Sequence, residues 1–259
     1  MIFIAIYHPL HYNILMEIKR FFIENRSIKV GETINISGEE YRHAIKVSRY
    51  KVGYSLILSN GDGNDYYAKI TEIDKDSFAC IVESSRKNEN ELKKPLALYL
   101  CAIERSDLAV QKATEIGATE IHLMISRFTN AVNQNLDRLK RIASESAKQC
   151  GRAVVPTIFA PISYEEGIED ALSRFEQTIF CYELARGHRI GDVFNPDASS
   201  YALIVGSEGG FAEEEVELAR SQGARVVTLG RRILRAETAC IAGLVLIADT
   251  MEKYENCCN

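Results

Sequence analysis

The residues best suited to hold a ligand lie in two glycine-bearing loops near the end of the chain. The first loop is GSEGGF, at residues 206–211, which follows the apolar stretch YALIV and precedes the acid-rich stretch AEEEVELA. Glycines permit positive φ angles and let a backbone approach a ligand closely. The loop is therefore a candidate ligand cradle, although a tight turn into a well-capped helix would show the same pattern.

The charges around this loop restrict the kind of ligand. Glu208 lies inside the loop, and three glutamates at 213–215 occupy the first turn of the expected helix, at the positive end of its dipole. Neither G-x-x-x-x-G-K-[ST] nor G-x-G-x-x-G is present. A pyrophosphate would meet like charge here. A ligand held by backbone groups, and neutral or cationic where it meets the loop, fits better, for example an adenosine that bears a sulfonium.

The second loop is LGRRILRAETA, at residues 229–239. Arg231, Arg232 and Arg235 flank the apolar pair Ile233 and Leu234. Arginines beside a glycine can bind phosphate or carboxylate in forked geometry, or they can simply pair with nearby acids. The apolar pair indicates that something flat, such as a base, packs on the loop.

The elements around both loops alternate between strands and helices. Apolar runs typical of strands covered on both faces are LALYLCA, EIHLMIS, QTIFCYE, YALIVG and RVVTLG, and the segments between them have helical patterns ending at glycines such as Gly117, Gly151 and Gly223. This alternation predicts an α/β fold with a parallel sheet, whose ligands bind beyond the carboxyl ends of the strands. The final segment, 235–254, is apolar almost all round, so we expect it in the core or in a subunit interface.

The first half of the chain has a different pattern. Short β-rich runs (RFFIE, TINIS, SLILS, YYAKITEI and FACIVES) surround one expected helix, SGEEYRHAIKVSR, for which Ser37 and Glu40 predict a capping box. Arg42, Lys46 and Arg49 would share one face of that helix. These patterns predict a small barrel-like β domain, and the polar stretch at 84–95 predicts a linker.

Composition is that of an ordinary globular protein, with a net charge of −5, although residues 19–51 carry eight Lys and Arg against four Asp and Glu. Seven cysteines are scattered without C-x-x-C spacing, which favours a reducing compartment and predicts no metal site. The first fifteen residues lack the basic region of a signal peptide, and Pro9 interrupts a run too short to span a bilayer. We expect no membrane association, and we hypothesise that the natural start is Met16.

Taken together, GSEGGF…EEEVELA and LGRRILRAETA resemble the C-terminal signature of the RsmE family, the 16S rRNA uracil-N3 methyltransferases of the SPOUT superfamily. IERSDLAVQKATEIGATEI, IASESAKQCGRAVVP, RFFI and HAIKVSRYKVG are similar to further family segments, so the resemblance covers roughly residues 19–248. Two positions depart from the family pattern: Ser207 stands where proline is usual, and Ser48 where leucine is usual.

The resemblance implies a SPOUT-type α/β domain with a parallel sheet and a C-terminal trefoil knot at 95–256, preceded by a small PUA-like β-barrel RNA-binding domain at 17–85. It implies an S-adenosyl-L-methionine-dependent enzyme that methylates N3 of a uridine in 16S ribosomal RNA, free or in the small ribosomal subunit. It also implies a homodimer, and we expect a cytoplasmic location. Alternatives are another SPOUT RNA methyltransferase specificity, or a non-catalytic RNA-binding or ribosome-assembly protein.

The resemblance implies the residues that hold the cofactor, and we hypothesise the catalytic residues and those that contact RNA. The expected catalytic residues are Arg232 or Arg235, which would stabilise the uracil anion or hold its phosphate, and Glu208, which would support the loop or act as a base. The residues expected to hold the rRNA backbone are Arg20, Arg42, Lys46, Arg49 and Arg152. The residues expected to bind the cofactor are Tyr182, Glu183, Gly206, Ser207, Gly209, Gly210, Leu229, Gly230, Ile233 and Leu234.

Overall fold

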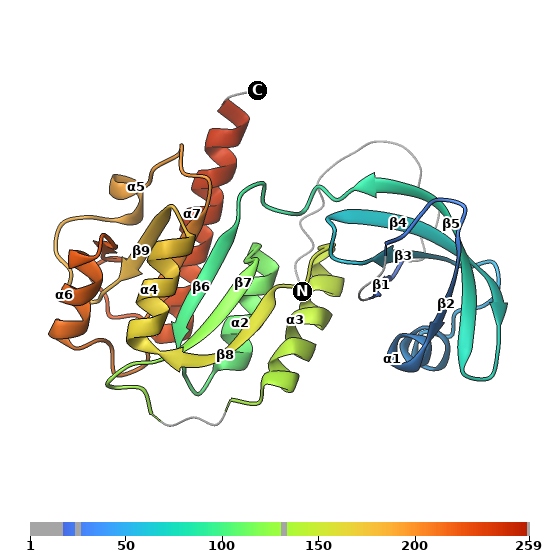
Figure 1. Cartoon of the computed structure of the whole chain (residues 1–259), viewed down its shortest axis with the longest axis horizontal. Coiled ribbons are helices and arrows are strands. Elements are labelled where there is room, and N and C mark those ends of the chain that lie inside the picture. Colours follow the sequence, from blue (N-terminus) through green and yellow to red (C-terminus); the bar gives the residue numbers. More distant parts are fainter. Residues whose placement is uncertain (1–17, 24–26, 131–133, 258–259) are drawn as a thin grey trace. The chain divides into compact units, whose positions relative to one another are not determined.

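The computed structural model describes residues 18–23, 27–130 and 134–257, which form two compact units (Figure 1). Unit 1 holds the described residues up to Ser59 together with Asp65–Arg86, and unit 2 holds Asn60–Asn64 and the chain from Lys87 onward. The hypothesis of a start at Met16 concerns residues that lie outside this described part. None of the helices in the described part of the chain could span a membrane.

Unit 1 is a small curled sheet of five strands in the order β1-β3-β4-β5-β2. Apolar and polar residues alternate along its strands, so one face of the sheet is buried and the other is exposed. In β2, Ile34 and Ile36 are buried while their neighbours along the strand are exposed. The buried side chains form one core that includes Phe21, Leu56 and Phe78. The strands are β1 (Arg20–Phe22), β2 (Thr33–Ser37), β3 (Ser55–Ser59), β4 (Asn64–Ile73) and β5 (Ser77–Lys87).

The helical segment of unit 1 differs from the expected regular helix. It begins as a short α-helix, α1 (Gly38–Tyr41), and continues as a π-helix, η1 (Arg42–Val47). In the described chain the Ser37 side chain makes no capping hydrogen bond, so the predicted capping box is wrong. Arg49 lies beyond the helix with a φ of 56°. A π-helix has a wider turn than the 3.6-residue period that the prediction used.

Unit 2 contains a six-stranded sheet in the order β11-β9-β10-β6-β7-β8, in which every pairing is parallel. Its central strands are buried on both faces, as the near-continuous apolar runs predicted. The strands are β6 (Leu96–Cys101), β7 (Glu120–Ile125), β8 (Thr157–Ser163), β9 (Gln177–Cys181), β10 (Tyr201–Val205) and β11 (Arg225–Val227).

Helices cover both faces of this sheet and bury two separate cores. On one face, side chains of α2, α3, α5 and α7 pack against alternate strand residues such as Leu98 and Leu203, and on the other, α4 and α6 pack against the intervening ones such as Tyr99 and Ile204. The helices are α2 (Ser106–Ile116), α3 (Leu136–Cys150), α4 (Tyr164–Arg174), α5 (Ile190–Val193), α6 (Glu213–Ser221) and α7 (Ala236–Cys257).

Two segments of the chain differ from what the sequence pattern predicts. The sequence did not indicate the strand β8, because Pro161 interrupts its apolar run. In the structure, the pairing of β8 with β7 contains a register shift. The polar stretch expected to be a linker is partly strand, since β5 extends to Lys87, and partly fixed to the rest of unit 2. Asn88 and Asn90 both donate to the carbonyl oxygen of Gly151, at 2.9 and 3.0 Å.

The sheet orders the loops that matter for function. From β6 the chain proceeds outward through β7 and β8, and it then crosses to the other side of β6, where β9, β10 and β11 lie in the spatial order β10-β9-β11 away from β6. The direction of winding therefore reverses between β6 and β10, and ligands of open α/β sheets bind outside the carboxyl ends of strands at such a point. The loops that follow β9, β10 and β11 meet at this edge because the three strands are parallel neighbours.

A buried histidine lies between two aromatic rings on the α4 face of the sheet. His122, in β7, stacks between Tyr99 and Phe159, with ring centroids 4.2 and 4.1 Å away. Its Nε2 lies 2.9 Å from a Glu120 carboxylate oxygen, and its Nδ1 lies 3.7 Å from Asp170. Burial lowers the pKa of His122 below its ordinary value of 6.5, although Glu120 opposes that shift. The ring is therefore neutral in the folded state at pH 7.

We expect this histidine to make stability fall in mild acid. Because the pKa of His122 is lower in the folded than in the unfolded state, its contribution is complete above pH 6.5 and is lost as the pH falls below that value. One proton changes stability by at most about 1.4 kcal/mol per pH unit. Urea unfolding at pH 7.5, 6.5 and 5.5 measures this slope. His122→Gln should flatten it and His188→Gln, at an exposed site, should not; equal slopes in both variants would contradict the assignment.

Candidate functional site

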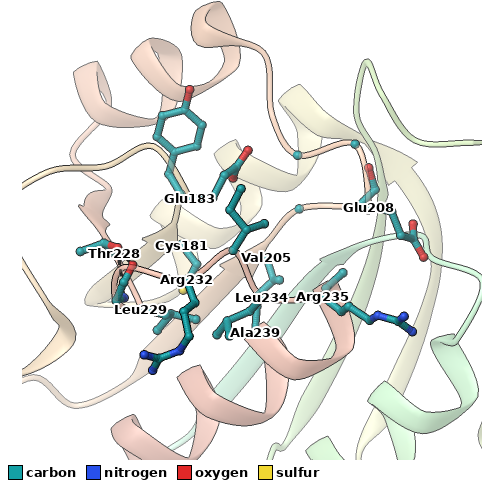
Figure 2. A pocket seen from close by; sticks show the side chains of 18 residues that line it. Cys181, Glu183, Val205, Glu208, Thr228, Leu229, Arg232, Leu234, Arg235 and Ala239 are labelled. Atoms are coloured by element: carbon teal, nitrogen blue, oxygen red, sulfur yellow. Dashed lines mark hydrogen bonds between the residues drawn. The ribbon is translucent and has the colours of Figure 1, made fainter.

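A cavity of about 420 Å³ lies at the carboxyl edge of β9, β10 and β11. Figure 2 shows its side chains, which come from the ends of these strands, the loops after them and the start of α7. All thirteen residues expected to be catalytic or to bind the cofactor line it, together with five others. The sequence analysis did not single out these five: Cys181, Val205, Thr228, Ala236 and Ala239. Cys181, Val205 and Thr228 lie at the ends of predicted strand segments, and Ala236 and Ala239 lie within the second loop, so the sequence could have indicated all five.

The glycine loop is shaped by close contacts that leave little room for side chains. A Cβ atom on Gly206 would lie 2.9 Å from the Phe211 ring, and one on Gly209 would lie 2.7 Å from the Cβ of Phe128. Gly210 has a φ of 70°, a conformation that glycine adopts without steric cost. Glycine is thus needed for packing and for backbone conformation, in addition to any close approach to a ligand.

We expect Gly209→Ala to weaken binding of S-adenosylmethionine, the cofactor that the resemblance implies, by roughly tenfold or more, since inserting a methyl group into a packed site commonly costs about 1–3 kcal/mol. The new Cβ would also lie 3.0 Å from the Phe128 carbonyl oxygen, a backbone atom that cannot rotate away. Isothermal titration calorimetry measures the affinity. Gly191→Ala is the matched control, because a Cβ added there would have no heavy atom within 4 Å. Equal affinities in the two variants would show that the loop tolerates the displacement.

Two polar contacts fix the loop between these glycines. The hydroxyl of Ser207 donates to the carbonyl oxygen of Phe128 at 3.2 Å, so the chain restrains by a hydrogen bond a position where the RsmE family usually has proline. Glu208 is exposed, and one of its carboxylate oxygens accepts a hydrogen bond from the backbone nitrogen of Glu104 at 3.2 Å. That bond joins the loop after β10 to the loop after β6, and it favours a supporting role for Glu208 over that of a base.

The arginine loop forms the opposite wall. Figure 2 shows the side chains of Arg232 and Arg235 extending in opposite directions from the wall that holds Leu234 and Ala239. Both arginines are exposed, and Ile233 between them is 80% exposed. The two guanidinium groups therefore do not converge on one point. We expected the same candidate roles of Arg232 and Arg235, but their side chains extend in different directions.

The ionisable groups in the cavity wall include neutral, negatively charged and positively charged side chains. Burial raises the pKa of the Cys181 thiol to about 12, so this thiol stays neutral and is no nucleophile at pH 7. Burial and the nearby Glu183 also raise the pKa of Tyr182. The carboxylates of Glu183 and Glu208 face the same cavity as the two arginines, so the wall offers negative charge for a sulfonium and positive charge for an anion.

The residues expected to bind rRNA fall into two groups. Arg42, Lys46 and Arg49 are exposed on unit 1, and RNA binding by them stays a prediction. Arg20 is buried and pairs with Asp65, with its Nη2 at 3.0 Å from the Oδ2 of that carboxylate. A phosphate cannot reach a guanidinium that the core encloses, so the expectation for Arg20 is corrected: it stabilises the fold of unit 1.

The expectation that Arg152 holds the rRNA backbone is also corrected. Its side chain is 2% exposed, its Nη1 donates to two carbonyl oxygens at 2.8 Å, and its Nε and Nη2 donate to Glu91 at 3.0 and 2.8 Å. An isolated charge is rarely buried without such partners. Arg152 therefore holds the segment around Glu91 against α2 and is not exposed for RNA. Sequence alone could not distinguish a surface arginine from a buried one.

No grouping of three or more His, Cys, Asp or Glu side chains suited to a metal occurs among the described residues. The cavity falls within the usual range of ligand sites, about 300–1,000 Å³. Its apolar residues, glycine backbone and carboxylates match the parts of S-adenosylmethionine, which are a flat base, a sugar and a sulfonium.

Comparison with known protein families identifies the class of protein to which this fold and this cavity belong. A family model described as RNA methyltransferase domain matches residues 88–248, and one described as RNA methyltransferase PUA domain matches residues 36–83. The first of these matches covers more than half of the chain.

Similar proteins of known name identify the particular family of RNA methyltransferases. The chain is 33% identical to ribosomal RNA small subunit methyltransferase E of Mesomycoplasma hyopneumoniae over 69% of its length and 79% of the relative's. It is 27% identical to the Bacillus subtilis protein of the same name, covering 90% and 97%. The chain belongs to the ribosomal RNA small subunit methyltransferase E family of RNA methyltransferases.

A solved structure from the same family is similar throughout. The Neisseria gonorrhoeae ribosomal RNA small subunit methyltransferase E, crystallised with S-adenosyl methionine, superposes with a TM-score of 0.82 at 27% identity, covering 90% of this chain and 98% of that one.

Proposed function

We propose that this protein transfers the methyl group of S-adenosyl-L-methionine to N3 of a uridine in the 16S ribosomal RNA of the small ribosomal subunit. The observation that carries the proposal is the cavity at the carboxyl edge of the sheet, lined by both signature loops of a chain that belongs to this family. In this proposal the cavity binds the cofactor, and the open side of the cavity receives the target base.

The chain's own groups would hold the cofactor from three loops. Leu229, Ile233 and Leu234 offer apolar surface for the adenine, and the backbone of the glycine loop approaches the sugar and the methionine part. When bound, S-adenosylmethionine supplies an electrophilic methyl group on a sulfonium. The carboxylates of Glu183 and Glu208 carry the charge that complements this cation.

The residues needed for chemistry must orient the uracil and stabilise negative charge on it. N3 of uracil loses its proton, and charge develops on the two adjacent carbonyl oxygens, which preorganised donors can stabilise in a site shielded from water. We assign this role to Arg235, which in Figure 2 extends toward the side on which Glu208 lies. Arg232, on the other side, would hold a phosphate of the rRNA.

The two units would divide the work. We assign RNA binding to the PUA-like domain at 17–85, where Arg42, Lys46 and Arg49 are exposed, and methyl transfer to the SPOUT domain at 95–256. Contacts between these cations and phosphates would make affinity fall with rising salt. An enzyme with this substrate would act in the cytoplasm, where ribosomal subunits are assembled.

We also propose that the C-terminal part of the chain forms a trefoil knot and that the protein is a homodimer. The exposed apolar side chains of α7 support the dimer: Val245 and Leu246 are 45% and 46% exposed, whereas Leu244 and Ile247 beside them are buried in the core. A second copy that covers them would remove apolar surface from water.

Two measurements test the proposed function. Calorimetric titration with S-adenosylmethionine should give one site per chain, and no binding would favour a non-catalytic RNA-binding or assembly protein. Mass spectrometry of digested 16S rRNA from a deletion strain should then show the loss of one N3-methyluridine, restored by the wild-type gene. Loss of a ribose 2′-O-methyl group instead would indicate another SPOUT specificity.

A further inference from the structure

An exposed aromatic and an exposed arginine lie next to each other in the loop after β7. The Phe128 side chain is among the exposed large apolar residues, with 46% of its surface accessible, and the Arg127 side chain is 63% exposed. The guanidinium carbon of Arg127 lies 5.7 Å from the centroid of the Phe128 ring, within the range of a cation–π contact. Neither residue lines the cavity.

The backbone that carries this pair is closed into a tight turn. The Ser126 nitrogen donates to the Thr129 hydroxyl at 2.9 Å, and the Thr129 nitrogen donates to the Ser126 carbonyl oxygen at 3.0 Å. The Arg127 nitrogen donates to a carboxylate oxygen of Glu215, at the start of α6, at 2.9 Å. Because the turn is already ordered, a ligand that packs on Phe128 has less conformational entropy to remove.

The same turn lies directly against the loop that lines the cavity. The Phe128 carbonyl oxygen accepts the hydroxyl hydrogen of Ser207, and Gly209 packs so closely that a Cβ there would lie 2.7 Å from the Cβ of Phe128. Ser207 and Gly209 both line the cavity. A nucleotide that places its base at the cofactor therefore brings its neighbours in the RNA chain close to this turn.

The charges around the pair favour a base over a phosphate as its ligand. The Arg127 guanidinium lies 3.5 Å from the carboxylate of Glu214, and Glu208 is exposed in the adjoining loop. These carboxylates repel a phosphate but leave the uncharged face of a nucleobase unaffected. The ion pair is solvent-exposed and weak, so Arg127 can exchange it for a contact with a base.

We propose that Phe128, together with Arg127, is a stacking platform for a nucleobase of the small-subunit rRNA that neighbours the methylated nucleotide. The inference rests on the proposed function and adds a substrate contact to the catalytic unit. Aromatic side chains and arginine planes are the usual partners of unstacked RNA bases. Phe128 is thus a residue for substrate binding that acts without touching the cofactor.

The test compares two replacements of Phe128 with the full-length protein. Phe128→Leu keeps an apolar side chain but removes the ring, and Phe128→Tyr keeps the ring. Loss of base stacking should weaken binding by roughly 5- to 100-fold in the leucine variant, while the tyrosine variant keeps wild-type affinity. The probe is a fluorescein-labelled RNA oligonucleotide centred on the nucleotide that the wild-type protein methylates, measured by fluorescence anisotropy. Calorimetry should give wild-type affinity for S-adenosylmethionine in both variants.

Phe159→Leu is the control, because Phe159 is a partly exposed aromatic of the same unit that does not line the cavity. Wild-type RNA affinity in the Phe128→Leu variant would overturn the platform. Equal weakening of RNA binding in the tyrosine and leucine variants would show that stacking is not the basis of the contact. A loss of cofactor affinity as large as the loss of RNA affinity would show that Phe128 only supports the glycine loop. A wild-type protein that methylates no rRNA would instead refute the proposed function itself.

Discussion

Glu91→Ala is expected to lower the free energy of unfolding by about 3–5 kcal/mol, the usual cost of removing one partner from a buried ion pair. One Glu91 oxygen accepts two hydrogen bonds from Arg152, and the other accepts the backbone nitrogens of Ala153 and Val154, both at 2.9 Å. Alanine would leave the guanidinium enclosed with only the carbonyl oxygens of Thr114 and Ala118, and two backbone donors without these acceptors.

Urea unfolding followed by circular dichroism measures the loss. Glu89→Ala, two residues earlier and exposed, is the matched control and should change stability little. Glu91→Gln should fall between the two, because the amide keeps an acceptor oxygen but carries no charge. A loss in Glu91→Ala no larger than in Glu89→Ala would mean that Arg152 finds other partners and that its burial matters little.

Arg235→Ala is expected to reduce the turnover number for rRNA methylation by roughly 100- to 1000-fold, as removal of a single donor to a developing oxyanion does in other enzymes. Arg235 lines the cavity, and its charge is available to the uracil oxygens only while the base is bound there. Since the proposed interaction forms in the transition state, the affinity for S-adenosylmethionine should be unchanged.

Single-turnover methylation at saturating cofactor separates this effect from binding. Arg232→Ala should instead raise the KM for RNA with a smaller change in turnover, since we assign it to a phosphate. Arg231→Ala is the control, because Arg231 is exposed in the same loop but does not line the cavity. If Arg232→Ala lost more turnover than Arg235→Ala, the two roles would have to be exchanged.

The sequence predicted the architecture of unit 2 well because its signals are local and redundant. Runs such as LALYLCA and YALIVG are strands buried on both faces, and Gly117 and Gly151 end their helices with φ angles of 114° and 80°. Where one local signal was broken the prediction failed, as at Pro161 in β8. It also failed where the helix changed its period, since the π-helix in unit 1 has no clear pattern in a stretch this short.

The candidate site was predictable for a related reason. Glycines, arginines and carboxylates that follow parallel strands must meet at one edge of the sheet, so their types and order indicated a cavity before any contact was known. All the residues expected at the cofactor line that cavity. The direction of each side chain was not predictable, and it is this direction that separates Arg232 from Arg235 in Figure 2.

By itself, the sequence determined the α/β class, most of the strand and helix order of unit 2, and the two main loops that line the cavity, because periodicity and glycine positions act over a few residues. Only the tertiary structure decided the environment of each charge. Arg20 and Arg152 are enclosed with Asp65 and Glu91, whereas Arg127 lies exposed beside Phe128. The physical reason is that burial and charge pairing join residues far apart along the chain, 61 positions for Arg152 and Glu91, and no local pattern records such a partner.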